Sequence, residues 1–155
     1  MFREMRMKEC ELPESEAAEI LRRNSYGVLA LDGDDGYTYA VPVNYAYTDN
    51  RIVFHGANEG YKFEAVQKND KVSFCVVEKN DVIAEDFNTL YRSAIAFGKI
   101  RVLEKDKERF EGLETLVSKF SQGYEEKGKE SIKKEWHVVA VFEIAIDRIT
   151  AKEGR

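Results

Sequence analysis

The chain has 155 residues, the size of one domain, and 43% of them are hydrophobic, as expected for a globular protein with a core. Two prolines and ten glycines exclude a disordered or collagen-like chain. The formal net charge is -5, with bases interleaved among acids, which argues against nucleic-acid binding. We therefore expect a single domain over residues 1–155 without a nucleic-acid partner.

The sequence also lacks the marks of export and of membrane insertion. No apolar run approaches the roughly 18 residues that a transmembrane helix needs, and the first eight residues are too charged for a signal peptide. Cys10 and Cys75 are the only cysteines, and two isolated thiols fit a reducing compartment better than a disulfide framework. These features predict a cytoplasmic protein with no membrane association.

The first quarter of the chain reads as a charged leader, a helix, a strand and a tight turn. Proline suits the first turn of a helix, so we expect a helix from Pro13 to about Asn24. A strand is predicted at residues 26–31, and a turn rich in aspartate and glycine at residues 32–36. A calcium loop is the alternative for the turn, but the glutamate of an EF-hand is missing at the required spacing. The apolar face of the helix consists of Ala17, Ile20 and Leu21.

The next segment has the pattern of a β-hairpin. Residues 37–47 and 51–57 are rich in β-branched and aromatic side chains, and residues 48–50 have turn chemistry. Pro42 cannot donate to a strand ladder, so this strand is expected at a sheet edge or at a bulge. Asn44 offers a donor and an acceptor that suit the polar edge of a flat heterocycle, although a structural role explains an asparagine equally well.

The exit of this hairpin resembles a phosphate site. The strand runs through His55, Gly56 and Ala57 toward a helix predicted at residues 59–69, with Lys62 near its start. Free backbone N–H groups and a nearby cation at a helix start favour phosphate binding. Taken singly, the histidine is more often structural and the lysine is more often solvated.

The centre of the chain is predicted to be mostly β-structure. Residues 71–77 form a mostly apolar run typical of a buried strand, residues 78–88 are polar and irregular, and residues 91–103 give the longest strand pattern. Gly98 is a candidate bulge at which this strand bends.

The last third begins with an amphipathic helix after Asp106, a candidate N-cap. We expect a loop with at most one helical turn at residues 121–135, a strand at residues 136–146 and a polar tail at residues 147–155. Five or six strands with intervening helices predict an antiparallel barrel with helices outside it. The helix carries an apolar stripe typical of core packing, made of Phe110, Leu113, Val117 and Phe120.

Seven segments, taken in order, resemble the FMN-binding split-barrel proteins related to pyridoxamine 5'-phosphate oxidase. Within that family they are most similar to the nitroimidazole-resistance (Nim-type) branch, whose strand carries a histidine at the position of His55. The segments are YGVLA (26–30), YAVPVNY (39–45), VFHGA (53–57), GYK (60–62), NDKVSF (69–74), YRSAIAFGK (91–99) and IAIDRITAK (144–152).

The resemblance implies a mainly β fold with peripheral helices: a six-stranded antiparallel split barrel that binds FMN in a cleft shared by the two subunits of a homodimer. It also implies which residues contact the cofactor. The backbone of Val41, Pro42, Val43 and Asn44 would face the flavin ring; His55, Gly56 and Ala57 would line the ring or the ribityl chain; Tyr61 and Lys62 would hold the phosphate; and Ser93 and Trp136 would lie near the ring.

Two departures from the oxidases narrow the expected activity. Tyr61 stands where the oxidases have a second phosphate-binding cation, and the C-terminal substrate-binding arginine and histidine pair has no clear equivalent. The resemblance therefore implies an FMN-dependent oxidoreductase that reduces small acceptors such as nitroaromatics or quinones, with a nicotinamide as the possible electron donor. His55 would be the catalytic residue, donating a proton or orienting the acceptor.

Two other readings remain open at this point. One is a non-catalytic protein of the same fold that binds flavin or haem, with His55 or His137 as the candidate iron ligand. The other is a structural or interaction protein that has kept the barrel and lost the ligand.

Overall fold

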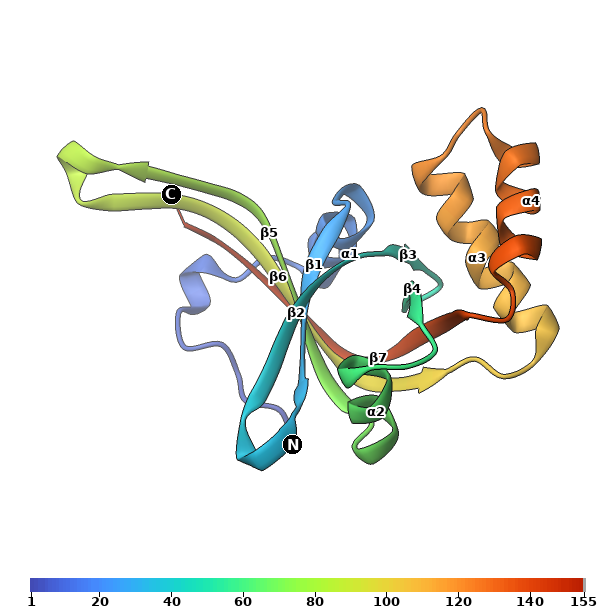
Figure 1. The fold of residues 1–155 in the computed structure, drawn as a ribbon. Helices are drawn as coiled ribbons and strands as arrows, with labels where there is room; N and C mark the ends of the chain where they lie inside the picture. The colour runs from blue at the N-terminus through green and yellow to red at the C-terminus, as the bar shows by residue number, and fades with distance from the viewer. Residues whose placement is uncertain (155) are drawn as a thin grey trace.

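Seven strands form one antiparallel sheet in the computed structural model of the chain, which describes residues 1–154 (Figure 1). The order of strands across the sheet is β2-β1-β5-β6-β7-β4-β3. The strands are β1 (Tyr26–Asp32), β2 (Thr38–Asn44), β3 (Ala46–Thr48), β4 (Arg51–Ala57), β5 (Lys71–Ile83), β6 (Asn88–Val102) and β7 (Val139–Gly154). The helices are α1 (Glu14–Arg23), α2 (Tyr61–Lys68), α3 (Asp106–Phe120) and α4 (Glu125–Glu135), with short 3₁₀ turns η1 (Lys8–Cys10), η2 (Asp34–Gly36) and η3 (Ala84–Asp86).

The mainly β fold with peripheral helices is confirmed, but the expected six-stranded split barrel is wrong in its strand count and closure, because seven strands form a sheet that does not close. The strand predicted at residues 37–47 divides at Tyr45, so that β2 pairs with β1 and β3 pairs with β4. Tyr45 is fully buried, its hydroxyl donates a hydrogen bond to the carbonyl of Leu21 at 2.5 Å, and its N–H donates to the carbonyl of Ser25. These bonds fasten the strand at this point. The two edges of the sheet are consecutive in sequence, so the sheet curves strongly without closing through a strand ladder.

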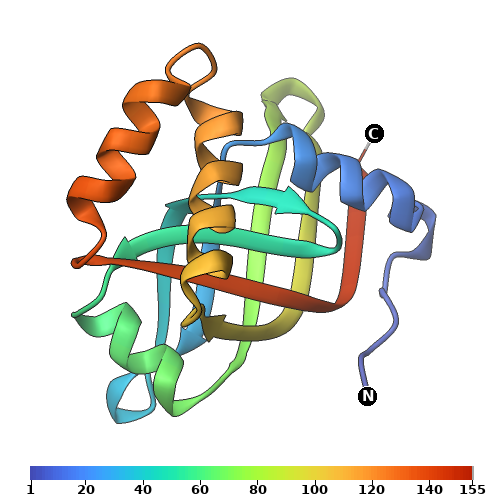
Figure 2. The same ribbon diagram turned by 90° about the vertical axis from the view of Figure 1, so that its right-hand side faces the viewer.

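The main core lies inside the curve of the sheet. Among its largest buried side chains are Phe54 of β4 and Phe142 of the neighbouring strand β7, whose rings stack 4.8 Å apart. Figures 1 and 2 place α1 and α2 at opposite ends of the curved sheet. The predicted apolar face of α1 is confirmed, because Ala17, Ile20 and Leu21 are all fully buried.

A second, smaller core lies on the outer side of the sheet, where α3 crosses β3, β4 and β7 (Figure 2). Leu113 of the predicted stripe is buried there, and Val117 is partly buried, whereas Phe110 and Phe120 are 36% and 42% exposed. The packing stripe is therefore correct in the middle of the helix and wrong at its ends. The buried members of this core are Ala46, Val53, Leu103, Leu113, Leu116, Ile132 and Val141.

Three segments predicted to be irregular are regular instead. Residues 78–88 lie mostly in β5 and β6, which continue past the sheet as a long hairpin arm (Figure 1). Residues 125–135 form α4, and residues 147–154 belong to β7. The predictions at Pro42 and Gly98 are confirmed, because the proline lies in the edge strand β2 and the β6–β7 register shifts between Phe97 and Gly98.

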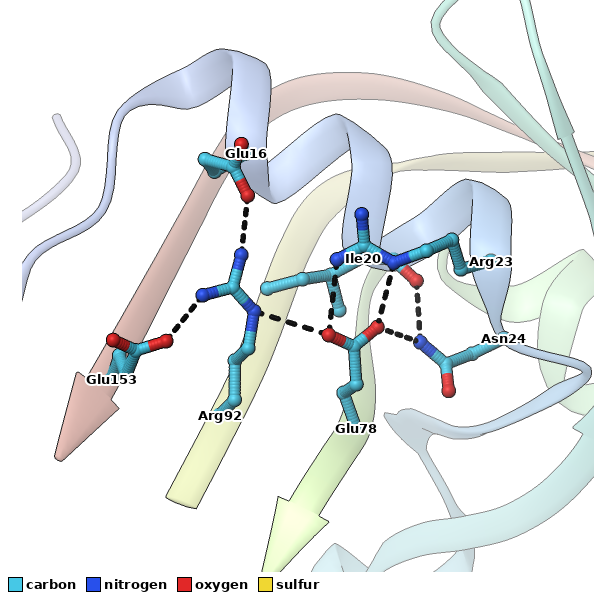
Figure 3. A network of polar contacts seen from close by, with 7 residues as sticks. All are labelled: Glu16, Ile20, Arg23, Asn24, Glu78, Arg92 and Glu153. Atoms are coloured by element: carbon cyan, nitrogen blue, oxygen red, sulfur yellow. Dashed lines mark hydrogen bonds and ion pairs between the residues drawn. The ribbon is translucent and has the colours of Figure 1, made fainter. Parts of the chain in front are cut away.

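An ion-pair network joins α1 to the base of the arm (Figure 3). The guanidinium of Arg92 in β6 contacts three carboxylates, and Glu78 of β5 also accepts hydrogen bonds from α1 and its C-cap. The contact to Glu78 measures 3.1 Å. The network therefore fixes the helix against three strands. Its members are Glu16, Arg23, Asn24, Glu78, Arg92 and Glu153.

Other features bear on the sequence predictions. Both cysteines are free thiols. None of the helices in residues 1–154 has the length and apolar character needed to cross a bilayer. Across the same residues, no three His, Cys, Asp or Glu side chains are grouped so as to hold a metal ion.

Candidate functional site

The candidate site is a split in the sheet between β2 and β4. Pairing of β3 with β4 ends where Ala46 lies opposite Val53, and on the other side of Tyr45 the chain pairs with β1, beginning with Asn44 opposite Tyr26. Residues 54–57 of β4 pair with β7 along one edge, and no strand within residues 1–154 pairs with their other edge. The outer edge of β2 is likewise unpaired over the described chain. The two arms of the split thus carry backbone groups that are free to bind a ligand.

The two predicted groups of cofactor residues lie on these two arms. Val41, Pro42, Val43 and Asn44 end β2, while His55, Gly56 and Ala57 end β4. Side chains alternate along a strand, so those of β4 face two directions. Phe54 belongs to the main core and Val53 to the outer core, so Gly56 lies on the inner face and His55 on the outer face.

A cavity of about 750 Å³ lies on the outer face, between β4 and the α3–α4 pair. Asn44, His55, Gly56 and Ala57 line its strand side, so the structure brings four predicted residues to one cavity. The volume is in the range of small-molecule sites. The helical side of the cavity includes Leu113, Leu116, Val117, Phe120 and Ile132.

Lys62 projects from the first turn of α2 toward the inner face of the split. A Cβ built on Gly56 would lie 3.1 Å from the Lys62 Nζ atom, so the glycine leaves room for the ammonium. This ammonium lies 5.8 and 5.9 Å from the ring centroids of Phe54 and Phe142, and no carboxylate of residues 1–154 forms an ion pair with it. Burial lowers the pKa of Lys62. A half-buried cation without an anion partner fits a phosphate-bearing ligand.

His55 is placed to act in its neutral form. Partial burial, and then the positive charge of Lys62, lower the pKa of His55 below 6.5. At neutral pH the imidazole therefore carries one N–H donor and one free nitrogen acceptor. The arrangement suits a hydrogen bond to a ligand better than donation of a proton.

Tyr61 anchors α2 rather than pointing freely to solvent. Its ring stacks on Tyr39 with centroids 4.3 Å apart, and its hydroxyl oxygen accepts a hydrogen bond from the N–H of Asp34 at 2.7 Å. The positive φ of Gly60, 102°, sets the entry into the helix. The start of α2, and with it Lys62, is thereby held against the β1–β2 turn.

Ser93 and Trp136 lie elsewhere in the single chain. Ser93 lines a different cavity, of about 460 Å³, on the β6–β7 surface beneath the N-terminal residues. The Trp136 ring packs under the guanidinium of Arg109, 4.0 Å from its centroid, and does not line the cavity of His55. Another cavity, about 790 Å³ in volume, is lined by residues such as Phe2, Lys71 and Lys99 and contains none of the predicted site residues.

Sequence reasoning missed the contribution of α4, because residues 121–135 were expected to form a loop. Tyr124, Lys127, Ser131 and Glu135 all line the cavity. The spacing of Lys127, Ser131 and Glu135, four residues apart, is a helical signal that could have revealed one continuous face.

Lys119 was also missed, although it secures the point from which the split opens. Its Nζ atom donates hydrogen bonds to the carbonyl oxygens of Tyr45, at 2.8 Å, and of Asn24, and it lies 4.3 Å from the centroid of the Tyr45 ring. Burial lowers its pKa to about 8. Nothing in the sequence alone distinguishes this lysine from a solvated one.

The chain is therefore a mainly β-protein with peripheral helices, whose antiparallel sheet is split between β2 and β4 and carries the cation of Lys62 beside the opening. A family model described as pyridoxamine 5'-phosphate oxidase matches residues 13–153, so the chain belongs to that family. The family recognised from the sequence motifs is therefore confirmed. A search of curated proteins gave no match.

Solved structures share the fold at low sequence identity. The flavocytochrome Anf3 from Azotobacter vinelandii superposes with a TM-score of 0.84 at 19% identity, covering 99% of this chain and 73% of that one. The FAD and haem binding protein from Mycobacterium smegmatis gives 0.78 at 21% identity, covering 92% and 72%. A protein from Bacteroides thetaiotaomicron proposed to confer 5-nitroimidazole antibiotic resistance gives 0.73 at 19% identity, covering 92% and 86%.

Proposed function

We propose that the chain binds FMN across the split between β2 and β4 and serves as an FMN-dependent oxidoreductase for small acceptors such as nitroaromatics or quinones. The observation that carries the proposal is the half-buried Lys62 ammonium, which lies beside Gly56 without an ion-pair partner in residues 1–154. Membership of the pyridoxamine 5'-phosphate oxidase family and the flavin-binding relatives of the same fold support it.

The residues of the split fit the parts of a flavin nucleotide. Lys62 would hold the phosphate, and the free edge of β2 from Val41 to Asn44 would offer backbone groups to the polar edge of the ring. Gly56 has no side chain, so the ammonium of Lys62 can lie close to the backbone of β4, where it would meet the phosphate. Bound flavin would supply the redox chemistry, carrying two electrons from a donor such as a nicotinamide to the acceptor.

The chain's own contribution to the reaction would be placement. His55 is neutral at pH 7, because burial and Lys62 lower its pKa, so its N–H would hydrogen-bond to an acceptor oxygen and orient it. The apolar side chains of α3 would exclude water from the cavity. No side chain of this site is required to form a covalent bond.

The test compares two lysines of α2. Lys62→Gln should weaken FMN binding by about tenfold or more, because a charge-assisted hydrogen bond is worth about 1.5–3 kcal/mol. Lys68→Gln is the matched control, since the Lys68 side chain is 72% exposed and pairs with Asp34. Riboflavin, which lacks the phosphate, should bind the wild type and Lys62→Gln equally. The proposal fails if FMN-supplemented protein never acquires a flavin absorption band.

We further propose a homodimer with the flavin site at the subunit interface. Val28, Cys75 and Ile95 lie side by side across β1, β5 and β6, on the face of the sheet that points away from the main core. Val77, on the same face of β5, is 56% exposed. Light scattering should give twice the 17.9 kDa chain mass, and a monomeric mass would contradict the proposal.

A haem-binding protein is the second candidate, because His55 presents a neutral imidazole to a largely apolar cavity. Titration with haemin would then give a Soret band that His55→Ala abolishes. A bound flavin that nicotinamides cannot reduce would instead favour a non-catalytic flavin carrier.

A further inference from the structure

We infer that the cavity between the α3–α4 pair and the outer face of β4 takes the electron acceptor, and that it selects neutral, flat aromatic molecules over anionic ones. This inference rests on the proposed flavin-dependent function, and it assigns the second substrate to residues of α3 and α4.

The acceptor cavity and the phosphate-binding lysine are separated by β4 itself. The His55 side chain lies on the outer face of the strand and lines the cavity, whereas the Lys62 ammonium lies on the inner face and does not line it. A ligand in the cavity therefore reaches His55 without competing for the ammonium of Lys62. A flavin that crosses the split would meet both the lysine and the cavity.

The depth of the cavity is apolar, and the two helices that form it are packed together. Leu113, Leu116 and Ile132 are each less than a tenth exposed. A Cβ on Gly128 would lie 2.9 Å from a methyl carbon of Val117, so α4 packs directly on α3 at this point. The two helices thus form one wall, and the open space lies between this wall and β4. A flat ring can bury its faces there at about 25 cal/mol per Å² of apolar surface.

The charges of the cavity lie on exposed side chains at its rim. Glu59 and Glu135 bring two carboxylates and Lys127 brings one ammonium, while His55 is neutral. Neither carboxylate forms an ion pair within residues 1–154. An anionic group carried into the apolar depth would find no cation and would lose its hydration. Phosphorylated substrates are disfavoured for the same reason. The oxygen of a neutral quinone or nitro group, in contrast, can accept a hydrogen bond from the N–H of His55.

The first experiment uses the FMN-loaded protein and fills the cavity. Ser131→Trp places an indole on the lining face of α4, and Ser118→Trp places it on an exposed position of α3 outside the cavity. We expect Ser131→Trp to raise the KM for menadione by about tenfold or more, with FMN affinity and melting temperature unchanged. Ser118→Trp should change none of these. An unchanged KM in Ser131→Trp overturns the inference.

The second experiment tests charge selection with probes of the same ring system. Menadione should give a higher kcat/KM than 1,2-naphthoquinone-4-sulfonate. The double variant Glu59→Gln, Glu135→Gln should raise kcat/KM for the sulfonate by roughly two- to fivefold, the worth of exposed charge interactions, and leave menadione unaffected. An equal or better rate with the sulfonate in the wild type overturns the selection for neutral acceptors.

A third measurement separates this inference from the proposed function. In flavin-free protein, 1,4-naphthoquinone should shift the amide NMR signals of residues 55–57 and 113–132. Shifts at these residues without any flavin binding would support the cavity and refute the flavoprotein. Two other outcomes would support the flavoprotein and refute the acceptor cavity. One is flavin-dependent quinone reduction with NMR shifts confined to other residues, and the other is such reduction with the cavity covered by a second copy of the chain.

Discussion

Replacement of Arg92 by methionine should destabilise the protein strongly at neutral pH. The Arg92 side chain is only 18% exposed and contacts Glu16, Glu78 and Glu153, whose side chains are between 20% and 42% exposed. Methionine retains much of the apolar stem but leaves three carboxylates close together without their shared cation. The helix α1 and the strands β5, β6 and β7 would then repel one another at this point.

The expected loss in the free energy of unfolding lies between the loss caused by breaking a buried ion pair and that caused by breaking a surface ion pair. Removing one partner of a buried pair costs about 3–5 kcal/mol, and an exposed pair contributes about 0–1 kcal/mol. Solvent reaches the three acids but scarcely the arginine, so we expect a loss of about 2–4 kcal/mol in the free energy of unfolding. For a domain of this length the melting temperature should fall by roughly 4–16 °C.

Urea unfolding followed by circular dichroism measures this loss without the screening that guanidinium salts would add. Arg23→Met is the matched control, because it removes the same charge from a 45% exposed side chain and leaves Glu78 paired with Arg92. The control should lose no more than about 1 kcal/mol. A loss below 1 kcal/mol in Arg92→Met would refute the reasoning.

The pH dependence gives a second check. Burial alone raises the pKa of Glu78, but hydrogen bonds from Arg23 and Asn24 and the charges of Arg23 and Arg92 lower it overall below 4.5. A depressed folded-state pKa stabilises the fold above the unfolded pKa, and this stabilisation is lost as the pH falls through the folded pKa. The difference between wild type and Arg92→Met should therefore be largest near pH 7 and shrink below pH 4.5. A difference that is constant with pH would contradict this origin.

Four further predictions concern Lys119, two glycines and His55. Burial lowers the pKa of Lys119 to about 8, so the unfolded state binds more protons than the folded state between pH 8 and 10.5. The stability of the wild type relative to Lys119→Met should therefore increase with pH over that interval. A stability difference that does not change with pH would refute this prediction. Gly98→Ala should cost about 1–3 kcal/mol by thermal unfolding, because its Cβ would overlap the neighbouring strand. Gly123→Ala, with open space but a positive φ of 88°, should cost about 1–2 kcal/mol or less. In an NMR titration His55 should have its midpoint below 6.5, and Lys62→Gln should move the midpoint upward, because the Lys62 charge is the second cause of the lowered pKa.

Much of the fold follows from local patterns in the sequence, since hairpin turns and alternation specify β1 to β4. The division of one strand at Tyr45 could not be predicted from local sequence, because it depends on hydrogen bonds from this residue to the carbonyls of Leu21 and Ser25. The hairpin arm was missed for another reason. Residues 78–83 of β5 are mostly exposed on both faces, so they carry no apolar alternation.

The candidate site was likewise predicted only in part from the sequence. The order of the sequence motifs predicted a group of strand residues, and the structure places four of them, Asn44, His55, Gly56 and Ala57, around one cavity. The helical wall was missed because α4 has one buried apolar residue, Ile132, in eleven positions and is otherwise polar or charged. Helices of this kind are stabilised by packing against a neighbour, here α3, rather than by their own periodicity.

Tyr45, the single residue between the edge strands β2 and β3, has a consequence for the order of folding. The hairpins β1–β2, β3–β4 and β5–β6 form between neighbours in sequence, but β4 pairs with β7, so that His55 lies opposite Val141. Contacts between residues so far apart in the chain form slowly, since loop closure must precede them. The opening beside Tyr45 should therefore acquire its shape only when β7 pairs with β4, although the residues that line the opening are synthesised much earlier. A nascent chain that ends before β7 should have its hairpins and still lack the site.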